Sequence, residues 1–325
     1  MNSHSMDMDK DAIGMSASPE IGDPQFTALP KEIDEEERRK TPIEPAPTRA
    51  RPIKVIHPPS FSIGAIFTGL RTLAQYSDLL YTLTLFRLHV RYKQSALGWA
   101  WAALQPLALM LIYTIIFTRV TTVATGGIPY PVFVFCALLP WIFFSGTISN
   151  AVNGLVLHPN LLTKMYFPRE IIPLSYMFAA LVDFGIASIL LVVLLKYYHV
   201  PLGWHLLYAL PIVLILAGFA AAIALFFSAV QIRFRDVGLA MPFLLQIWMF
   251  TVPVVYSLQS VPVRFRSWYL LDPVAPLIES FRGLVIHGTA PKVGMLAFCG
   301  ATTVAVLALT YAFFKSSEAT MTDVI

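Results

Sequence analysis

The sequence predicts an all-α integral membrane protein, in which six transmembrane helices follow an amphipathic helix at the membrane interface. Composition gives the first indication, since hydrophobic residues make up 57% of the chain and charged residues only 13%. A soluble domain carries about 25% charged residues. The second indication is a set of apolar segments, each long enough to cross a hydrocarbon core of about 30 Å. The third is a periodic polar stripe directly before the first of these segments.

Six apolar segments are expected to form the transmembrane domain, which we place at residues 97–325. They cover residues 97–118, 131–153, 174–195, 204–230, 238–257 and 293–314. The connection between the last two, residues 258–292, carries many apolar and aromatic residues among several prolines. It is too polar to span the membrane and too apolar for a plain linker. We therefore expect short re-entrant helices in this connection, dipping into the membrane interface.

The first 60 residues differ from the rest of the chain in charge and proline content. They hold 11 of the 19 acidic residues and nine of the 24 prolines, with little apolar surface. Such a segment cannot repay the entropy of ordering, so residues 1–60 are expected to form a disordered acidic tail. No apolar signal-peptide core follows the N-terminus, which predicts that the tail stays in the cytoplasm.

Residues 61–96 have the pattern of an amphipathic helix that lies in the membrane interface. The polar stripe follows helical spacing and comprises Arg71, Gln75, Asp78, Thr82, His89 and Lys93. The apolar residues that lie away from it are Leu73, Tyr76, Leu80 and Leu83. An alternative is a helix packed on a soluble domain, but the chain has no such domain. We expect Arg87, Arg91 and Lys93 to anchor this helix by contacting lipid phosphates.

Lysine and arginine residues predict the orientation of the spans, because cytoplasmic loops carry an excess of them. With the N-terminus inside, eight Lys and Arg residues flank the spans on the inner face and two lie in the short outer loops. The 258–292 connection adds four more on the outer face. The inner face still has more Lys and Arg residues than the outer face, eight against six, and this excess predicts that both termini lie in the cytoplasm.

The chain has no motif that would make it an enzyme. The phosphate-binding pattern GxxxxGK[ST] is absent, as are HExxH, GxSxG and CxxC. Isolated histidines without metal-ligand spacing occur at His158, His199, His205 and His287. The two cysteines, Cys136 and Cys299, lie in apolar segments and are expected to be buried. We expect no catalytic residue, no metal and no cofactor on this chain.

Polar residues inside the predicted spans are candidates for function, because burying them in the membrane is costly. Asp183 lies near the middle of the third span. It could relay protons or line a pore, but a buried acid that hydrogen-bonds a neighbouring helix is the favoured interpretation. The second span carries Ser145, Ser149 and Asn153 on one face, which indicates helix contacts or a pore lining.

Aromatic residues make up 13% of the chain and offer flat apolar faces on which sugar rings could pack. The candidates for lining a translocation path are Trp99, Tyr113, Phe117, Trp141, Phe144, Trp248 and Tyr256. A belt of aromatic residues at the two membrane surfaces is the alternative interpretation for part of this set.

Four short motifs resemble those of the membrane subunits of polysaccharide-export ABC transporters. They are RYKQSALGWAW at residues 91–101, running on to Leu104-Gln105-Pro106, FPREIIP at 167–173, FRDV at 234–237 and TDVI at 322–325. The resemblance covers residues 65–325 and is specific as a set. It implies a subunit of the bacterial cytoplasmic (inner) membrane that exports a lipid-linked glycan, such as O-antigen, capsule or teichoic acid.

The same resemblance implies partners and roles. The subunit would form a homodimer with two copies of a separate ATPase, which would bind ATP and Mg²⁺, and nucleic acid would not be a partner. Residues 258–292 would form an outer gate. The residues expected to couple the permease to the ATPase are Lys164, Phe167, Pro168, Arg169, Glu170, Arg235 and Asp236. Because loop charges are normally solvated, we expect Arg169 and Glu170 to be exposed.

Three other functions compete with glycan export. A permease of the same superfamily could move a small drug or lipid, although the aromatic faces favour a glycan. A membrane-embedded glycan-modifying enzyme would need a cluster of His, Asp or Glu at one membrane face, which the sequence lacks. An ion-coupled carrier would need several charges inside the membrane, whereas Asp183 is alone there.

Overall fold

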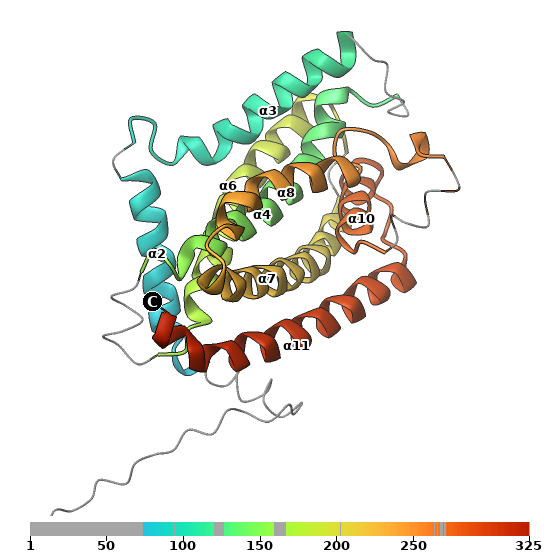
Figure 1. Cartoon of the computed structure of the whole chain (residues 1–325). Helices are drawn as coiled ribbons and strands as arrows, with labels where there is room; N and C mark the ends of the chain where they lie inside the picture. Colours follow the sequence, from blue (N-terminus) through green and yellow to red (C-terminus); the bar gives the residue numbers. More distant parts are fainter. Residues whose placement is uncertain are drawn as a thin grey trace, which may run out of the picture. The chain divides into compact units, whose positions relative to one another are not determined.

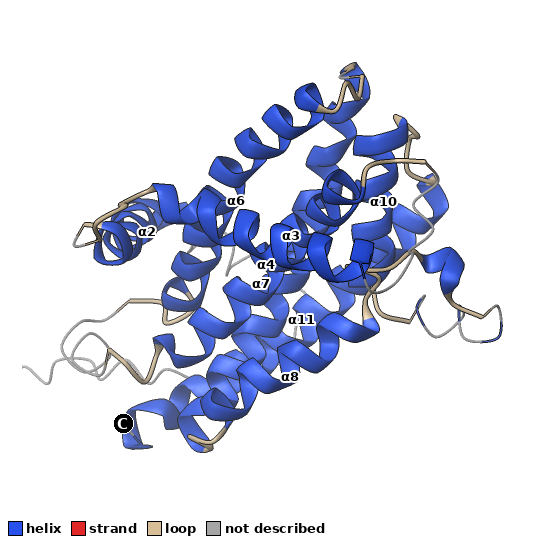
Figure 2. Ribbon diagram, turned by 90° about the horizontal axis from the view of Figure 1, so that it is seen from above, coloured by secondary structure: helices blue, strands red, loops and turns tan. Residues whose placement is uncertain are grey.

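The computed structural model describes residues 74–93, 95–119, 127–158, 167–201, 203–262, 264, 266, 269 and 271–324. These residues belong to the second of two compact units, Ile56–Ile325. The predicted tail of residues 1–60 and Lys164 lie outside the described ranges. Within those ranges the regular structure is entirely helical, without a strand, as Figure 2 shows.

The helices follow one another in the order drawn in Figure 1. Their bounds are α2 Ser77–Tyr92, α3 Ala100–Arg119, α4 Tyr130–Gly154, α6 Ile171–Tyr197, η1 Trp204–Tyr208, α7 Ala209–Arg233, α8 Val237–Thr251, η2 Leu258–Ser260, α10 Val274–His287 and α11 Val293–Val324. Five of the described helices are long and apolar enough to cross a membrane: α3, α4, α6, α7 together with η1, and α11. The prediction of an all-α membrane protein is confirmed at this level.

The fifth predicted span is shorter than expected. Residues 238–257 were predicted to be helical throughout, but α8 has 15 residues and ends at Thr251. At 1.5 Å per residue this is about 22 Å, less than a hydrocarbon core of about 30 Å. The reason is Pro253, which disfavours helical backbone in the residue before it, and Val252 is accordingly extended. The long helices of the described part number five, and not six.

The connection before the last helix also differs from the expectation of short interfacial helices. Ten of the 14 residues of α10 are buried, and the helix packs against α4 and α7. Its start is fixed by Asp272, whose Oδ1 accepts a hydrogen bond of 3.0 Å from the Val274 amide. Its end is set by Gly288, which has a left-handed backbone with φ of 63°. Thus α10 is part of the protein core.

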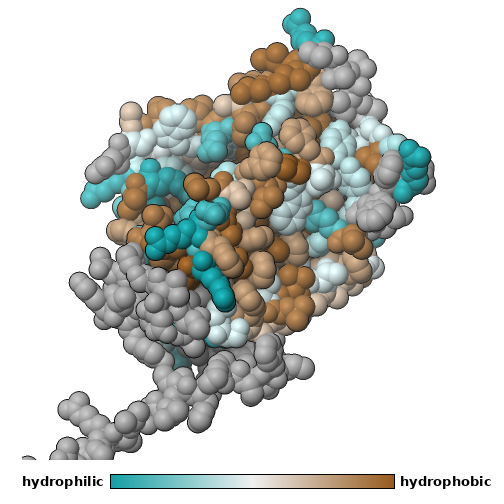
Figure 3. All heavy atoms as spheres, viewed as in Figure 1, coloured by the Kyte–Doolittle hydropathy of each residue, from teal (hydrophilic) through white to brown (hydrophobic). Residues whose placement is uncertain are grey.

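The central element is α4. Of its 25 residues, 18 are buried, because α3, α6, α7, α8 and α10 all pack around it. By contrast, only 17% of the most apolar stretch is buried in each of the helices α3 and α11. Their outward residues are nevertheless apolar, and Figure 3 shows hydrophobic residues spread over the visible surface. Apolar outward faces of this kind suit a lipid environment.

The helix α2 is amphipathic, as the sequence predicts. Thr84, Leu88 and Tyr92 are buried, and the helix packs against α6. The described members of the polar stripe, which are Gln75, Asp78, Thr82, His89 and Lys93, are all exposed. A further exposed group on α2 is apolar and comprises Tyr81, Phe86 and Val90.

Candidate functional site

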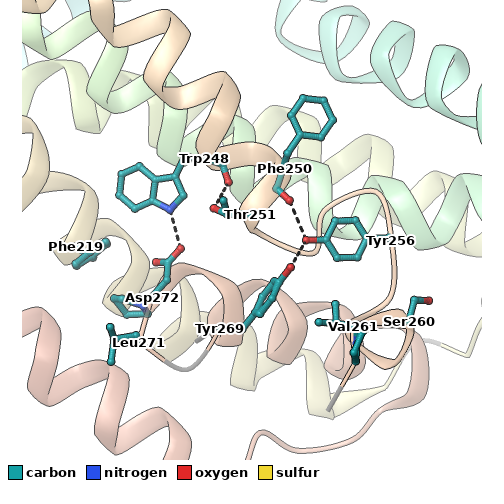
Figure 4. Close-up of a pocket in the computed structure, with 12 residues that line it drawn as sticks. Phe219, Trp248, Phe250, Thr251, Tyr256, Ser260, Val261, Tyr269, Leu271 and Asp272 are labelled. Carbon is teal, nitrogen blue, oxygen red and sulfur yellow. Dashed lines mark hydrogen bonds between the residues drawn. The ribbon is translucent and has the colours of Figure 1, made fainter. Parts of the chain in front are cut away.

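An aromatic cavity of about 1000 Å³ lies between α7, α8 and the segment that precedes α10 (Figure 4). Its wall carries the rings of Phe219 from α7, Trp248 and Phe250 from α8, and Tyr256 and Tyr269 from the following segment. The cavity brings together side chains from three parts of the chain that are up to 54 residues apart. We call it the aromatic cavity.

Hydrogen bonds hold the rings of the aromatic cavity in place. The indole nitrogen of Trp248 donates to Asp272 Oδ2 at 2.7 Å. The hydroxyl of Tyr256 donates to the Phe250 carbonyl at 2.9 Å and lies 2.9 Å from the Tyr269 hydroxyl. Burial raises the pKa of Asp272, and its hydrogen bonds from Trp248 and the Val274 amide oppose that shift. The result is a set of oriented aromatic faces with a few fixed polar groups.

Arg282 of α10 supports this arrangement from within the core. Its side chain is 3% exposed and lies 4.2 Å from the centre of the Phe133 ring. It donates to the carbonyl of Pro253 and, at 3.2 Å, to that of Tyr256. An ion pair of 2.8 Å joins it to Glu279. The sequence analysis counted Arg282 on the outer face of the membrane and did not predict its burial. Its spacing of three residues from Glu279 was the available signal.

Two of the predicted path residues, Trp248 and Tyr256, line the aromatic cavity. Two others do not, because α4 is surrounded on all sides. Phe144 is fully buried and Trp141 is 4% exposed. Phe144 stacks on Phe219 at 6.0 Å and meets Trp248 edge-on at 5.1 Å. The prediction that Trp141 and Phe144 line a path is therefore corrected: they pack behind the cavity wall.

The three candidates of α3 and its N-terminal turn lie apart from this cavity. The hydroxyl of Tyr113 is 3.8 Å from the sulfur of Met249 in α8. Phe117 stacks on an aromatic ring of α4 at 5.9 Å. Trp99, at the opposite end of α3, is 46% exposed and stacks on Tyr92 at 4.8 Å. None of these three residues belongs to the described wall of the aromatic cavity.

A charged cluster joins the start of α6 to the end of α11. Glu170 is 1% exposed and pairs with Lys315 at 2.9 Å, and it accepts a bond of 3.2 Å from the Tyr311 hydroxyl. Lys315 also pairs with Glu318 at 2.9 Å. Arg169 donates to the Glu318 carbonyl at 2.7 Å. The expectation that Arg169 and Glu170 are exposed is wrong for Glu170, because α11 covers it.

The other predicted coupling residues divide into buried and exposed groups. Phe167 is 8% exposed and packs in a cluster with Ile171 and Phe314, while Pro168 is half-buried. At the turn between α7 and α8, Arg235 and Asp236 are exposed, and the neighbouring residues Arg233 and Phe234 are exposed as well. This exposed turn is the surface that a partner subunit could contact.

Gln231 ties the α7–α8 turn to α4. Its side-chain nitrogen donates to Asn153 Oδ1 at 3.2 Å and to the Arg235 carbonyl at 3.1 Å. Its side-chain oxygen accepts from the Gly238 amide. Asn153 is thus a contact between helices, as one interpretation of its stripe predicted, whereas the Ser145 hydroxyl bonds a carbonyl of its own helix.

Asp183 pairs with the end of α2. Its Oδ1 accepts from the Tyr92 hydroxyl at 2.8 Å, and its Oδ2 accepts from the Arg91 guanidinium. The geometry favours the interpretation of a carboxylate bonded to a neighbouring helix. Part of the Arg91 guanidinium is thus committed to Asp183, while its side chain remains 37% exposed. Lys93 remains exposed.

Arg87 was likewise expected to contact lipid phosphates, but it contacts protein groups. Its guanidinium lies 4.1 Å from the centre of the Tyr176 ring and bonds His158. Burial, together with the nearby Arg87 charge, lowers the pKa of His158. The positive charge of Arg87 disfavours protonation of the His158 ring, because protonation would add a second positive charge beside the first. Among the described residues, no group of three or more metal-ligating side chains occurs.

Comparison with known proteins gives this geometry its context. A model of the ABC-2 type transporter family matches residues 78–286. The chain therefore belongs to the ABC-2 type transporter family, which confirms the expectation of a transport subunit and not an enzyme.

Three relatives are similar over most of their length. The O-antigen export system permease protein RfbA of Myxococcus xanthus is 32% identical over 249 residues, 76% of this chain and 95% of the relative. A protein of the same name from Klebsiella pneumoniae is 30% identical over 214 residues, 65% of this chain and 82% of the relative. The polysialic acid transport protein KpsM of Escherichia coli is 24% identical over 243 residues, 74% of this chain and 93% of the relative.

Proposed function

We propose that this chain is the membrane-spanning permease subunit of an ATP-driven exporter, which moves a lipid-linked polysaccharide across the bacterial cytoplasmic membrane. The relatives named as O-antigen and polysialic acid export proteins support this proposal. The observation that carries it in the structure is the aromatic cavity, in which Trp248, Tyr256 and Tyr269 surround a volume of about 1000 Å³.

The chemistry of the aromatic cavity suits a glycan. The C–H faces of sugar rings pack on flat aromatic rings, while their hydroxyls need hydrogen-bond partners. Trp248 and Tyr269 supply the faces, and Asp272 and Ser260 supply polar groups at the edge. Contacts of this kind are individually weak, so a chain of sugars could advance past them. A purely apolar substrate would gain nothing from the Asp272 carboxyl.

We further propose six membrane crossings with both termini in the cytoplasm. Asn153 and Gln231 join the end of α4 to the α7–α8 turn, and Glu170 and Lys315 join the start of α6 to the end of α11. These contacts support a common face for five helix ends. Under this proposal α11 begins at the opposite face, and the chain returns there after α7 through α8 and the residues after Thr251, although α8 has only 15 residues.

The partners in this proposal are a second copy of the chain and two copies of a separate ABC ATPase, which holds ATP and Mg²⁺. The exposed α7–α8 turn with Phe234, Arg235 and Asp236 is the proposed contact for the ATPase. The buried Glu170–Lys315 pair would carry a movement of the α6 start to α11. The chain itself needs no cofactor under this proposal.

Replacement of aromatic residues tests the proposal. Trp248→Leu and Tyr256→Leu, made together, keep apolar volume but remove two flat faces. We expect glycan export in cells that depend on this chain to fall severalfold, and more than the abundance of the protein. Trp204→Leu is the matched control, because Trp204 is 89% exposed and outside the cavity. Full export by the double variant would contradict the proposal, and a changed export of small amphiphiles instead would favour a drug or lipid permease.

A further inference from the structure

A second cavity, of about 530 Å³, lies between the end of α2 and the helices α3, α4 and α6. It shares no wall residue with the aromatic cavity. Its volume falls in the range of about 300–1,000 Å³ that is typical of ligand clefts. Neither the export of a glycan nor the coupling to an ATPase assigns a role to this cavity. We call it the α2–α3 cavity.

The wall of the α2–α3 cavity changes from polar to apolar along α4. Asn150, near the C-terminal end of α4, lines it together with polar groups of the α2–α3 region, which are Arg91, Ser95 and Gln105. Eleven residues earlier, about 16 Å along the helix axis, the wall is formed by Leu139. Ile142, Phe143 and Phe184 complete the apolar part. Polar and apolar side chains that line one cavity match a lipid headgroup with the root of its acyl chains.

The wall of the α2–α3 cavity contains one positive and one negative group. Arg91 and Asp183 form an ion pair whose side chains are 37% and 19% exposed, so both can still be reached. The ion pair does not use all the hydrogen-bond donors of Arg91 or all the acceptor positions of Asp183. A guanidinium has five N–H donors, and a carboxylate offers about four acceptor positions. Asp183 uses two of these positions, for Arg91 and for the Tyr92 hydroxyl.

We propose that the α2–α3 cavity binds the headgroup of a zwitterionic phospholipid that carries a phosphate and a primary ammonium, as phosphatidylethanolamine does. The phosphate lies against the free donors of Arg91, and the ammonium donates to Asp183. Gln105 and Asn150 bond the polar atoms near the glycerol, and the first acyl carbons lie against Phe143 and Phe184.

Charge selects this class of lipid over others. An anionic lipid without an ammonium group would bring the same phosphate to Arg91, but it would have no positive group to offset the repulsion between that phosphate and Asp183. A lipid diphosphate would carry still more negative charge to the same place. A headgroup that carries a negative and a positive charge can pair with both Arg91 and Asp183. Tyr92 holds the carboxylate in position from the other side, through a bond of 2.8 Å.

Photolabelling of the full chain tests this proposal. The purified protein is placed in phosphatidylcholine nanodiscs with a trace of phosphatidylethanolamine that carries a diazirine at the start of one acyl chain. We expect crosslinks to peptides that contain residues 101–106 and 139–150. Unlabelled phosphatidylethanolamine should compete, and phosphatidylglycerol should compete at least about tenfold less well, a difference of about 1.4 kcal/mol.

Two matched pairs of variants separate the site from general effects. Gly146 lines the cavity, and a Cβ added there meets no heavy atom within 4 Å, so Gly146→Leu fills the space without a clash at its base. Gly185→Leu in α6 is its control, since that glycine also has open space but does not line the cavity. Arg91→Gln should reduce labelling, while exposed Lys93→Gln should not.

The outcomes are distinct. Labelling that falls about tenfold in Gly146→Leu and stays unchanged in Gly185→Leu supports the proposal. Equal labelling in both glycine variants would overturn it, as would equal competition by phosphatidylglycerol. If a polyprenyl diphosphate sugar displaces the probe and phosphatidylethanolamine does not, the cavity belongs to the transported substrate and the proposal is wrong. Elution of each variant as the intact protein in size-exclusion chromatography confirms folding.

Discussion

Two carboxylates show how strongly the surroundings of a side chain decide its role. Asp183 lies in α6 and Glu170 directly precedes that helix, and both pair with a basic residue of another helix. Glu170 is 1% exposed and is held by Lys315 and Tyr311, so it is a structural ion pair at a helix junction. Asp183 faces the α2–α3 cavity and can be reached. Burial and the position of the partner, and not the residue type, separate the two.

Removal of one member of the buried pair should destabilise the protein strongly. Lys315→Ala leaves the Glu170 carboxylate buried with only the Tyr311 hydroxyl as a side-chain partner. Breaking a buried ion pair by removing one partner costs about 3–5 kcal/mol. Denaturant unfolding of the purified protein in detergent measures this change. Lys93→Ala is the control, because Lys93 is exposed and surface substitutions stay within about 0.5 kcal/mol.

The double variant Glu170→Gln with Lys315→Met sharpens this test. It removes both charges, so no unpaired charge remains, and much of the stability should return. If Lys315→Ala were no more destabilising than Lys93→Ala, the pair would contribute nothing to the junction between α6 and α11.

At the scale of elements, hydrophobic patterning predicts the long helices well. The segments 97–118 and 131–153 correspond to α3 at Ala100–Arg119 and α4 at Tyr130–Gly154. Each of these helices is a continuous run of apolar residues, and the length of such a run is enough to predict that it spans a membrane. The pattern fails at α8, because the helix ends before Pro253 and a hydropathy pattern does not register this proline.

The burial of α10 could not be predicted from its own residues. Its sequence has an amphipathic pattern that suits an interfacial helix equally well. Tertiary packing decides between the two, because α10 packs against α4 and α7 and Arg282 donates to backbone carbonyls. An arginine that is buried and donates hydrogen bonds to backbone carbonyls gives no periodic pattern in a single sequence.

Loss of Arg282 should loosen the turn after α8. Arg282→Met keeps apolar length but removes the donors to the carbonyls of Pro253 and Tyr256. We expect amide hydrogen exchange in residues 254–262 to accelerate about tenfold or more, since each charge-assisted bond contributes about 1.5–3 kcal/mol. Exchange measured by mass spectrometry checks this result. Lys292→Met is the control, because Lys292 is exposed in the same connection, residues 258–292. Equal exchange in both variants would show that Arg282 does not hold the turn.

At the scale of the whole molecule, the family and the all-helical membrane class could be predicted from the sequence, whereas the walls of the cavities could not. The four short motifs indicated the family that comparison now assigns. Aromatic residues of α4 and α8 share the same helical spacing, yet Phe144 is fully buried and Trp248 lines a cavity. Only the arrangement of the neighbouring helices distinguishes them.

ATP-driven transport by the reconstituted complex tests the central claim most directly. The full chain and the ABC ATPase that purifies with it are placed in vesicles with a lipid-linked glycan on the ATPase side. We expect the glycan to become accessible on the opposite side only when both subunits, ATP and Mg²⁺ are present. The chain alone should hydrolyse no ATP, since it lacks the phosphate-binding loop GxxxxGK[ST]. Translocation without the ATPase, ATP hydrolysis by the isolated chain, or an active complex that leaves the glycan on its original side would contradict the account.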